Sequence, residues 1–502
     1  MLAFAGLGIL PSITFGAEID AAAVKDLTSL QSLAARLAHQ PFEPLSKPLD
    51  PFFDNLKYDG HRQIRFKEDA AHYSELNNSF RIEFFHPGWT AKKTVGMFDL
   101  ANGQTTPINY DSKLFDWGQL KVPDSVQYPN GFAGFRVLAP DSFLNRRFEF
   151  LVFMGASYFR AVTTELGYGL SARALSINTI GGEPEEFPDF THFWFEKPQA
   201  GDRFFKCLAL LNGPSVVGAY SFEAMPGKTT EMFVKGMIWL RKPVKSLGIS
   251  PFSSMFWFGE NSHPKPYDFR PEVHDSDGLQ IELEDGTHLW RPLDNTPGQL
   301  RLSLFEAVNM KGFGLAERDR DFKRFEDLEA VYHRRPAVWV EPLTGFEAGK
   351  VTLVEIPTGE ETWDNIVAFY EPAKMPTADA PLSFSYRLQW LEEHEPDKLA
   401  KVLATRRGFV MDSPDHLYVV DFTAGETQGQ KAPDWLPEIA VKISSGDAKV
   451  IDQRVMKNPE TNGWRAFFKL QIPEKTNLIE MNCELKDKDK LISERWMYQW
   501  RR

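Results

Sequence analysis

Hydrophobic and polar positions alternate along most of the chain, in short stretches cut by Gly, Pro and Asp. Between residues 58 and 391 these stretches are RIEFFHPG at 81–88, FEFLVFMGASYFRAV at 148–162, EMFVKGMIWLRKPV at 231–244, KVTLVEIP at 350–357, NIVAFYEP at 365–372 and LSFSYRLQWL at 382–391. Alternation with such punctuation is typical of antiparallel strands. Their number predicts a mainly β protein, with one large antiparallel β-sandwich over residues 41–390 rather than a parallel α/β sheet.

A second set of strand patterns follows a charged interruption. The interruption, LEEHEPDKLA at 391–400, contains Pro and is typical of a linker. Beyond it, LYVVDFTAG, EIAVKISSGDAKVIDQRVM, WRAFFKLQI, NLIEMNCELKD and SERWMYQW predict several strands within residues 401–502, which is the size of an immunoglobulin-like sandwich. The Cys–Trp–Cys pattern of true immunoglobulin domains is absent, so only the architecture is predicted.

One segment near the N-terminus has helical spacing instead. EIDAAAVKDLTSLQSLAARLAHQ, at 18–40, carries charged residues between apolar positions that recur every three or four residues. These apolar positions are Val24, Leu27, Leu30, Leu33 and Leu37. The pattern predicts an amphipathic N-terminal helix over residues 18–40.

The first seventeen residues, MLAFAGLGILPSITFGA, form an apolar run that ends in small residues, as the hydrophobic region of an export signal does. No Lys or Arg precedes Lys25, and Phe15 fits poorly at a small-x-small cleavage site. We therefore expect residues 1–17 to be the remnant of an export signal, the alternative being a buried N-terminal segment. The run is too short to span a bilayer, and no other stretch approaches 18 apolar residues, so we expect a soluble mature protein.

Composition narrows the class of ligand. The 502 residues include 42% hydrophobic residues, enough to bury the cores of two domains. A net charge of −12 argues against nucleic acid, which is bound through clustered Lys and Arg. The 13 Trp and 41 Phe offer flat apolar faces that stack on sugars as well as in a core, so a neutral ligand fits better. Two cysteines, Cys207 and Cys483, provide no disulfide framework.

Several kinds of site fail on spacing. In PEVHDSDGLQIELEDGTHLWRPL at 271–293, a calcium loop starting at Asp275 would have Leu279 at its fifth position, and its Gly would come at the fourth position, as Gly278, instead of the sixth. HExxH and Cys/His zinc spacings are absent, so no metal is expected. The G-x-S-x-G elbow, the P-loop and the dinucleotide fingerprint are absent too, so no cofactor is expected.

What remains is carboxylate chemistry, since cleavage of a glycosidic bond needs only two carboxyl groups in different environments. Three settings are unusual: HDSDG at 274–278, AERDRDFKRFEDLEAVYHRRP at 316–336 and EIPTGEETWDNIVAFY at 355–370. The alternating charges of the second setting are equally consistent with structural ion pairs. In the third, Asp364 precedes an apolar run, where desolvation would raise its pKa toward that of a general acid, or where it would cap a turn. Spacing alone does not choose among the 69 acidic residues.

Twelve stretches carry a resemblance to a known family. They are YDGHRQIRF, FFHPG, GFAGFRV, MGASYFRAV, YGLSARALSINT, EEFPDFTHFWFE, GISPFSSMFWFGEN, FRPEVHDSDGL, WRPLDN, GFGLAERDRDF, RRPAVWVEP and VEIPTGEETWDNIVAFY. In this order they resemble the osmoregulated periplasmic glucan biosynthesis proteins of the G/D type, from about residue 41 to the end. DLTSLQSLAARLAHQ, EEFPDFTHFWFE and LAKVLATRRG look closer to protein D, although the twin-arginine export signal usual for protein D is missing here.

The resemblance implies a large galactose-mutarotase-like sandwich joined to a smaller immunoglobulin-like one, in the periplasm. It also implies an endo-acting, anomer-inverting β-1,2-glucanase, with the family's general acid falling on Asp364 in ETWDNIV and its general base on Asp275 in VHDSDGL. Asp277 is then a turn residue or a support for Asp275. For a base that acts at long range, Tyr332 in VYHRRP is the expected proton relay.

Further expectations concern the ligand. His274 either holds Asp275 ionised by a hydrogen bond or is a structural histidine. The side chains expected to line a glucan cleft are Arg160, Arg173, Trp290, Arg291 and Trp363. Besides β-1,2-glucan, the partners that fit are a glucan synthase, glucan-modifying enzymes and a second copy of the chain.

Two other functions stay open. One is a non-catalytic glucan-binding scaffold that holds the nascent backbone for other enzymes. The other is a sugar epimerase or mutarotase, because large β-sandwiches host those activities as well. The latter needs a His–acid pair on the sugar ring, and the eleven histidines show no such pair at an obvious spacing.

Overall fold

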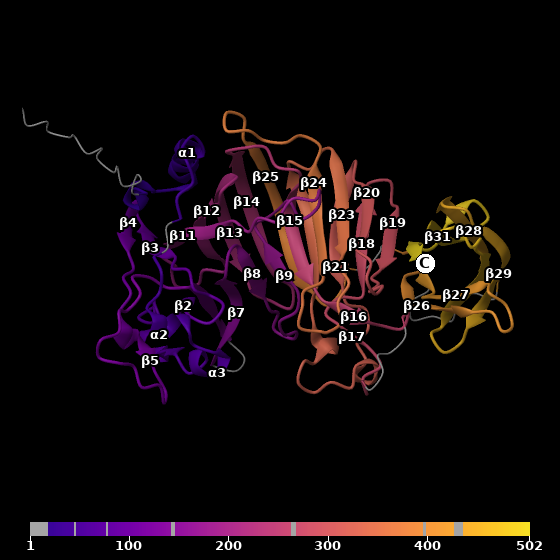
Figure 1. The fold of residues 1–502 in the computed structure, drawn as a ribbon, viewed down its shortest axis with the longest axis horizontal. Helices are drawn as coiled ribbons and strands as arrows, with labels where there is room; N and C mark the ends of the chain where they lie inside the picture. The colour runs from indigo at the N-terminus through magenta and orange to yellow at the C-terminus, as the bar shows by residue number, and fades with distance from the viewer. Residues whose placement is uncertain are drawn as a thin grey trace, which may run out of the picture.

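The computed structural model describes residues 19–44, 47–76, 79–141, 146–262, 268–394, 398–425 and 435–502. Within them the chain is mainly β and is arranged as stacked sheets, which confirms the predicted β-sandwich fold (Figure 1). The segment expected to be an export-signal remnant lies outside the described residues. Among the helices that are described, none combines the length and the apolar character needed to cross a membrane.

Two large sheets dominate. The ten-stranded sheet runs through β2 (Arg81–Phe85), β6 (Gly134–Asp141), β7 (Arg146–Met154), β8 (Tyr158–Ala161), β9 (Ser171–Arg173), β15 (Leu247–Ser254), β24 (Ile366–Pro372), β23 (Gly349–Glu355) and β20 (Arg301–Glu306), with β10 (Leu175–Ile177) also on β15. The fifteen-stranded sheet runs through β28 (Glu438–Ser445), β31 (Leu478–Asp487), β33 (Arg495–Arg501), β19 (His288–Pro292), β18 (Gly278–Leu283), β21 (Met310–Ala316), β22 (Ala337–Thr344), β25 (Leu382–Leu391), β14 (Thr230–Leu240), β13 (Val216–Met225), β12 (Phe205–Asn212), β11 (Asp189–Glu196), β3 (Gly96–Ala101) and β4 (Gln104–Pro107), with β32 (Lys490–Leu491) also on β31.

The remaining described elements are three smaller sheets, three helices and five 3-10 turns. The small sheets are β1 (Arg65–Phe66) with β5 (Phe115–Asp116), β16 (Phe256–Phe258) with β17 (Val273–His274), and β26 (Val402–Phe409), β27 (His416–Phe422), β30 (Gly463–Gln471) and β29 (Lys449–Asn458) in that order. The helices are α1 (Leu27–Ala38), α2 (Pro51–Asp54) and α3 (Tyr58–His61), with the 3-10 turns η1 (Ala21–Ala23), η2 (Glu68–Ala70), η3 (Ser112–Leu114), η4 (Phe322–Arg324) and η5 (Tyr332–Arg334).

Phenylalanine fills the space between the two large sheets. Phe153 and Phe159 point inward from β7 and β8 and meet Phe222 of β13 edge-on, with ring centroids 5.1 and 5.6 Å apart. Such pairs each add about 0.5–1.5 kcal/mol beyond the burial of their area. All three rings are buried in one core that draws on both sheets. The alternation read from the sequence therefore orients one face of each strand toward this core.

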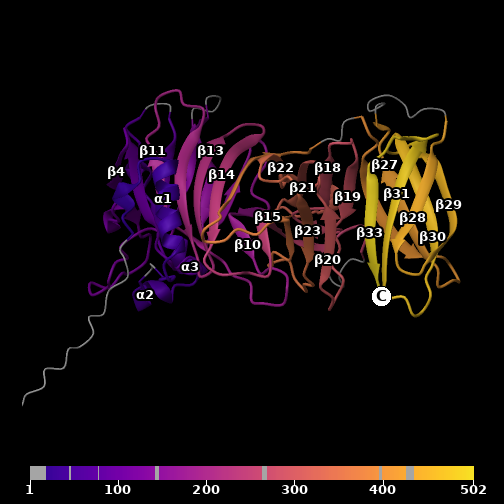
Figure 2. The same cartoon turned by 90° about the horizontal axis from the view of Figure 1, so that it is seen from above.

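Helix α1 covers the outer face of the fifteen-stranded sheet (Figure 2). Leu30, Leu33 and Leu37 are buried there in an apolar cluster with side chains of β12 and β13. The helix starts only at Leu27, because the Asp26 carboxylate accepts the backbone N–H of its third residue and closes a capping box. The prediction of a helix over residues 18–40 was therefore too long at its start, since η1 and an extended stretch occupy residues 21–26.

The C-terminal strands form a second sandwich. The four-stranded sheet packs on β28, β31 and β33 around a core of its own that includes Tyr418, Phe468 and Trp496. Its second layer continues the fifteen-stranded sheet, because β33 pairs in parallel with β19 and places Trp496 opposite Trp290. The limits of the predicted domains stay a prediction, and the two sandwiches share one sheet.

The predicted linker is packed where it is described. The His394 ring stacks on Trp339 with centroids 3.7 Å apart, and its Nε2 lies 3.1 Å from Glu282.

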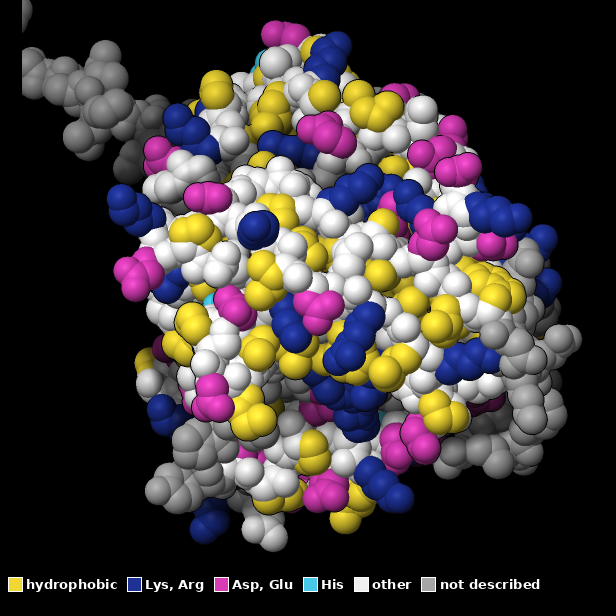
Figure 3. Space-filling view, turned by 90° about the vertical axis from the view of Figure 1, so that its right-hand side faces the viewer, with side chains coloured by type: hydrophobic (Ala, Val, Ile, Leu, Met, Phe, Trp, Pro, Cys, Tyr) yellow, Lys and Arg dark blue, Asp and Glu magenta, His cyan; other side chains and the backbone are white. Residues whose placement is uncertain are grey.

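Seen from the C-terminal end, Lys, Arg, Asp and Glu side chains are interspersed with apolar ones (Figure 3). This mixed face differs from the one-sign stripe that binds a phosphate backbone. Cys207 and Cys483 are both buried and free.

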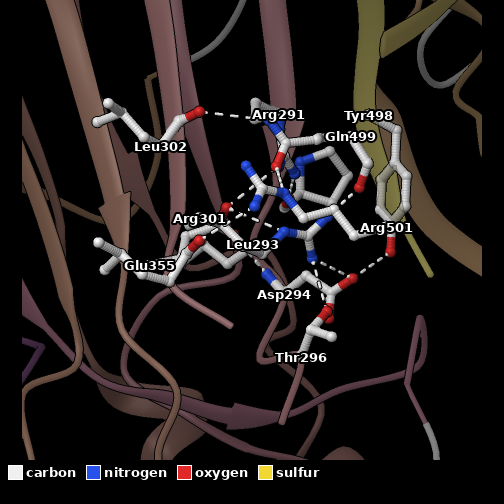
Figure 4. Close-up of polar contacts among 12 residues, drawn as sticks. Arg291, Leu293, Asp294, Thr296, Arg301, Leu302, Glu355, Tyr498, Gln499 and Arg501 are labelled. Atoms are coloured by element: carbon white, nitrogen blue, oxygen red, sulfur yellow. Dashed lines mark hydrogen bonds and ion pairs between the residues drawn. The ribbon is translucent and has the colours of Figure 1, made fainter. Parts of the chain in front are cut away.

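A buried ion network joins the two sandwiches (Figure 4). Asp294 accepts a hydrogen bond of 2.6 Å from the Tyr498 hydroxyl and lies 2.6 Å from Nη1 of Arg301. Glu355 accepts the backbone N–H of Asp294 at 2.8 Å and an Arg291 N–H at 3.1 Å. Glu355 is the last residue of β23, so the network fixes the point from which the next loop departs.

Candidate functional site

Asp275 and Asp364 lie on either side of β16, although they are far apart in the sequence. Asp275 follows β17, which pairs with β16, and its backbone N–H donates to the Met255 carbonyl at 2.8 Å. Asp364 ends the loop between β23 and β24, next to Asn365, whose side chain bonds the backbone of Phe256. The short sheet of β16 and β17, at the lower edge of the large sheets in Figure 1, is thus their common neighbour.

Two asparagines anchor the loop over residues 356–365. The Asn365 side chain accepts the N–H of Phe256 at 2.8 Å and donates to the carbonyls of Phe256 and Ile356 at 3.0 and 2.9 Å. The Asn295 side chain accepts the N–H of Thr358 at 3.0 Å and donates to its carbonyl at 3.0 Å. Because both ends are tied, the loop presents its outer residues at a defined place.

The outer residues of the loop are exposed. The Asp364 side chain is 40% exposed, and its Oδ2 lies 3.9 Å from Nη2 of Arg160 on β8. Trp363 is 64% exposed, and its indole N–H donates to the Glu360 carboxylate. Trp363 and Asp364 line a surface hollow of about 630 Å³ together with residues 356–360 and Asn365. The hollow therefore combines an aromatic face with a carboxyl group, and the guanidinium group of Arg160 lies beside that carboxyl group; such groups bind and act on a sugar.

Asp275 is more enclosed, with only 14% of its side chain exposed and Nε of Arg335 3.4 Å from its Oδ1. The guanidinium of Arg335 also lies over the Tyr332 ring, 5.3 Å from the centroid. Burial raises the pKa of Asp275, Arg335 opposes that rise, and the charge of Asp364 adds to it. Asp275 is therefore a more basic carboxyl than one in water.

Tyr332 lies beside Asp275 in η5, with its side chain buried. Its hydroxyl donates to Oε2 of Glu361 at 2.7 Å. Burial and this contact raise the pKa of Tyr332 well above its usual value, and Asp275 adds to the rise. The same Glu361 oxygen accepts an Arg270 N–H at 2.7 Å. The Tyr332 proton is thus directed at Glu361 and not at Asp275 in this conformation.

Three residues expected to line a glucan cleft lie elsewhere. Trp290 is buried under the guanidinium of Arg318, 3.5 Å from the ring centroid, in the core of the C-terminal sandwich. Arg291 is buried in the ion network with Glu355. Both expectations are corrected, because the sheet shared by the two sandwiches encloses these side chains. Of the five side chains expected to line a glucan cleft, Arg160 and Trp363 are exposed at the surface around Asp364.

Arg173 is also buried, but in a different place. It pairs with Glu185 at 2.9 Å, and its guanidinium lies between the rings of Tyr158 and Phe187, 5.5 and 5.6 Å from their centroids. These two rings line a separate hollow of about 620 Å³. Arg173 is therefore buried behind the rings of this hollow, and its expected role in lining a glucan cleft stays a prediction.

His274 does not hold Asp275. Its Nδ1 lies 2.7 Å from Oε2 of Glu317 and its Nε2 lies 3.1 Å from Oε2 of Glu272, so both ring nitrogens are engaged by other carboxylates. The structural alternative for His274 is the one that the contacts support. Asp277 is buried beside this group and does not lie in an exposed turn.

The sequence reasoning missed three contacts of this site, made by Arg335, Glu361 and Asn365. Arg335 carried a signal, because it follows Tyr332 by three residues and side chains at that spacing coincide in a 3-10 turn. The turn alone did not separate it from its neighbour Arg334. Glu361 and Asn365 contact residues of distant segments, and sequence spacing contains no such information.

Comparisons with known proteins all match glucan biosynthesis proteins. The family model described as "Periplasmic glucan biosynthesis protein, MdoG" matches residues 26–500. Glucans biosynthesis protein G of Pseudomonas paraeruginosa and of Pseudomonas aeruginosa are each 39% identical over 487 residues, covering 94% of this chain and 92% of the relative. Glucans biosynthesis protein G of Serratia proteamaculans is 39% identical over 481 residues, covering 93% and 91%. These relatives carry the name of protein G, so a closer likeness to protein D is not supported.

Proposed function

The chain belongs to the periplasmic glucan biosynthesis protein family, and from this we propose that it is a periplasmic, endo-acting, anomer-inverting β-1,2-glucanase. The observation that carries the proposal is the convergence of Asp275 and Asp364 on β16. One carboxyl group is enclosed and more basic than usual, and the other is exposed beside an aromatic face. Acid–base cleavage of a glycosidic bond requires two carboxyl groups in different environments.

Asp364 acts as the general acid. A glucan that stacks on Trp363 brings a glycosidic oxygen to the Asp364 carboxyl, which gives its proton to that oxygen as the bond to the anomeric carbon breaks. Arg160 is held by a hydrogen bond of 2.6 Å from its Nε to the Ser171 hydroxyl, and its remaining N–H groups donate to sugar hydroxyls, because almost half of its side chain is exposed. The leaving sugar then departs as a neutral alcohol.

Asp275 acts as the general base. It takes a proton from the water that attacks the anomeric carbon from the opposite side, so the new C–O bond has the inverted configuration. Arg335 holds Asp275 in the ionised form that this step needs. The site then returns to its starting state by moving one proton from Asp275 back to Asp364 through water.

In inverting enzymes the two catalytic carboxyl groups usually lie roughly 6.5–9.5 Å apart. For a larger separation of Asp275 and Asp364, Tyr332 is assigned to carry the proton from the attacking water to Asp275. The relay requires the Tyr332 hydroxyl to turn its proton from Glu361 toward Asp275. The raised pKa of Asp275 favours that transfer.

Incubation of the purified protein with linear β-1,2-glucan, followed by chromatography of the products, tests the proposal. We expect short β-1,2-glucooligosaccharides from the wild type and a loss of about 10²–10⁴-fold in rate for Asp364→Asn and for Asp275→Asn. Asp321→Asn is the matched control, because its exposed carboxylate only caps η4 and Asn caps a helix equally well.

The alternative is a non-catalytic protein that holds the nascent glucan backbone for other enzymes. Retention of the glucan without any products from the wild type would establish this scaffold function. Asp275 and Asp364 would then be contacts to bound sugar, and the hydrolase proposal would be abandoned.

A further inference from the structure

A group of acidic side chains surrounds His274. Its members come from loops that follow β16 and β21 and from both ends of β17. They are Glu260, Glu272, Asp277, Glu317 and Asp319. The backbone N–H of Asp277 donates to the Ala316 carbonyl at 2.8 Å and holds two of these loops together. The catalytic scheme above uses none of these five carboxyl groups.

His274 is oriented as metal-binding histidines are. It is fully buried, and Glu317 accepts from one ring nitrogen at 2.7 Å. A carboxylate on one ring nitrogen fixes the ring and makes the other nitrogen a better ligand. The other nitrogen faces Glu272, and one ligand atom each from Glu272, His274 and Asp319 lie within 4.8 Å of one another. Three ligand atoms this close together can share one ion.

Asp277 provides an independent indication of a ligand. Asp277 is only 7% exposed, and none of the described residues forms a hydrogen bond or an ion pair with its carboxyl group. That group lies within the electrostatic reach of Glu260, Asp319 and Glu317. Oδ2 of Asp319 is likewise buried and has no hydrogen-bond partner in the described part of the chain. A buried carboxylate without a partner is unfavourable until a cation or a proton neutralises it.

The cations in contact do not balance the acids. Arg324 lies 3.3 Å from Oε1 of Glu272 and 3.4 Å from Oδ1 of Asp319, and His274 is the other cation. Within the described part of the chain, five carboxyl groups therefore face the charges of His274 and Arg324, with the charge of Arg318 acting on Asp277 as well.

We propose that Glu272, His274 and Asp319, with Asp277 beside them, bind one divalent metal cation. A set of one imidazole nitrogen and carboxylate oxygens suits Mn²⁺ or Zn²⁺ better than the all-oxygen sites that Ca²⁺ and Mg²⁺ prefer. Arg324 provides the way in, because its side chain is 34% exposed and swings into water when an ion replaces it.

The bound ion has a structural consequence. It ties the segment around β17 to the segment that follows β21, and Asp275 lies directly after His274. The sequence reasoning expected no metal because it tested linear spacing only. These ligands come from two segments, residues 272–277 and Asp319, that the fold brings together. The inference does not depend on the hydrolase proposal, because metal binding is measured without glucan.

Calorimetric titration of the full chain, stripped with EDTA, with MnCl₂ and separately with ZnCl₂ tests the site. Metal analysis after gel filtration gives the stoichiometry. We expect about one ion per chain with at least one of the two metals, and a melting temperature that rises on loading. Asp319→Asn and Asp277→Asn are each expected to weaken binding at least 10-fold, since outer partners alone account for about 10–100-fold.

Asp321→Asn is the matched control, since it removes the same charge two residues from Asp319 and keeps its cap on η4. It should bind metal as the wild type does. In metal-free protein, Asp319→Asn should not lower the melting temperature, because it removes one of several crowded carboxyl groups. Absence of saturable binding of both metals, or equal affinity of wild type, Asp319→Asn and Asp277→Asn, overturns the proposal in favour of a cluster balanced by protons.

Discussion

At the scale of single residues, the ionisation of Asp275 depends on Arg335. Burial raises the pKa of Asp275 above the ordinary value of about 3.9, and Arg335 is the largest influence that lowers it. Because the base must be ionised, kcat/KM falls as the pH drops through this pKa. In Arg335→Gln the largest opposition to the effect of burial is lost and only Arg160 still lowers the pKa of Asp275, so this acid limb should move to higher pH, as measured in a pH profile.

Arg334→Gln is the control for this change. Arg334 is exposed and donates to the Glu165 carbonyl, so its loss should leave the acid limb in place. An acid limb that does not move in Arg335→Gln would show that Asp275 is not the base.

Tyr332→Phe separates a proton relay from a binding contact. The substitution keeps the ring under Arg335 and removes only the hydroxyl that donates to Glu361. We expect kcat to fall about 10²-fold, in the range of general acid–base catalysis, with KM nearly unchanged. Tyr168→Phe, which removes a hydroxyl that likewise donates to a glutamate, Glu149, should change neither constant. A raised KM with an unchanged kcat would instead identify Tyr332 as a substrate contact.

At the scale of elements, the position of Asp364 depends on the loop over residues 356–365 and on its anchors. Asn365→Ala removes three hydrogen bonds to the backbone of Phe256 and Ile356. The loop should then shift, and kcat/KM on β-1,2-glucan should fall about 10²-fold, since displacement of a catalytic group by 1 Å has that effect. Kinetics with a folding check by circular dichroism measures it.

Asn212→Ala controls for the loss of a buried asparagine. Asn212 is buried on β12 and accepts from Arg241, away from this loop. Asn212→Ala should lower the free energy of unfolding without lowering kcat/KM on β-1,2-glucan. Equal activities for Asn365→Ala and Asn212→Ala would remove the positioning role from Asn365.

At the scale of the whole molecule, the ion network at Asp294 holds the two sandwiches together. Burial raises the pKa of Asp294, but Arg301 and Arg407 overcome this effect and keep its pKa below the usual range. Asp294→Asn leaves both guanidinium groups without their shared carboxylate. Loss of one partner from a buried network should lower the free energy of unfolding by about 3–5 kcal/mol, as measured by urea denaturation.

Asp412→Asn provides the comparison. Asp412 is exposed and has a left-handed backbone that Asn adopts as readily, so its effect should stay within about 0.5 kcal/mol. Similar effects of the two substitutions would mean that the network contributes little to the contact between the sandwiches.

Local sequence patterns predicted which segments form helices and strands. They predicted less well where these elements end and which other segments they contact. β2, β14, β23, β24 and β25 lie where alternation predicts strands, because each strand orients its own side chains to two faces. The start of α1 was misjudged because the capping box at Asp26 decides it, and apolar spacing continues past that point to Val24. The charged stretch at 391–400 also gave no indication that His394 stacks on Trp339.

By itself, the sequence determined a mainly β protein, its strands and its aromatic core, because alternation and apolar content act within each segment. Its motifs also carried the likeness to a glucan biosynthesis family and the choice of Asp275 and Asp364. Only the tertiary structure decided that Trp290 and Arg291 are enclosed by a sheet common to both sandwiches. It alone brought the acidic group together around His274. The physical reason is that burial and charge depend on contacts between distant segments, which spacing along the chain does not specify.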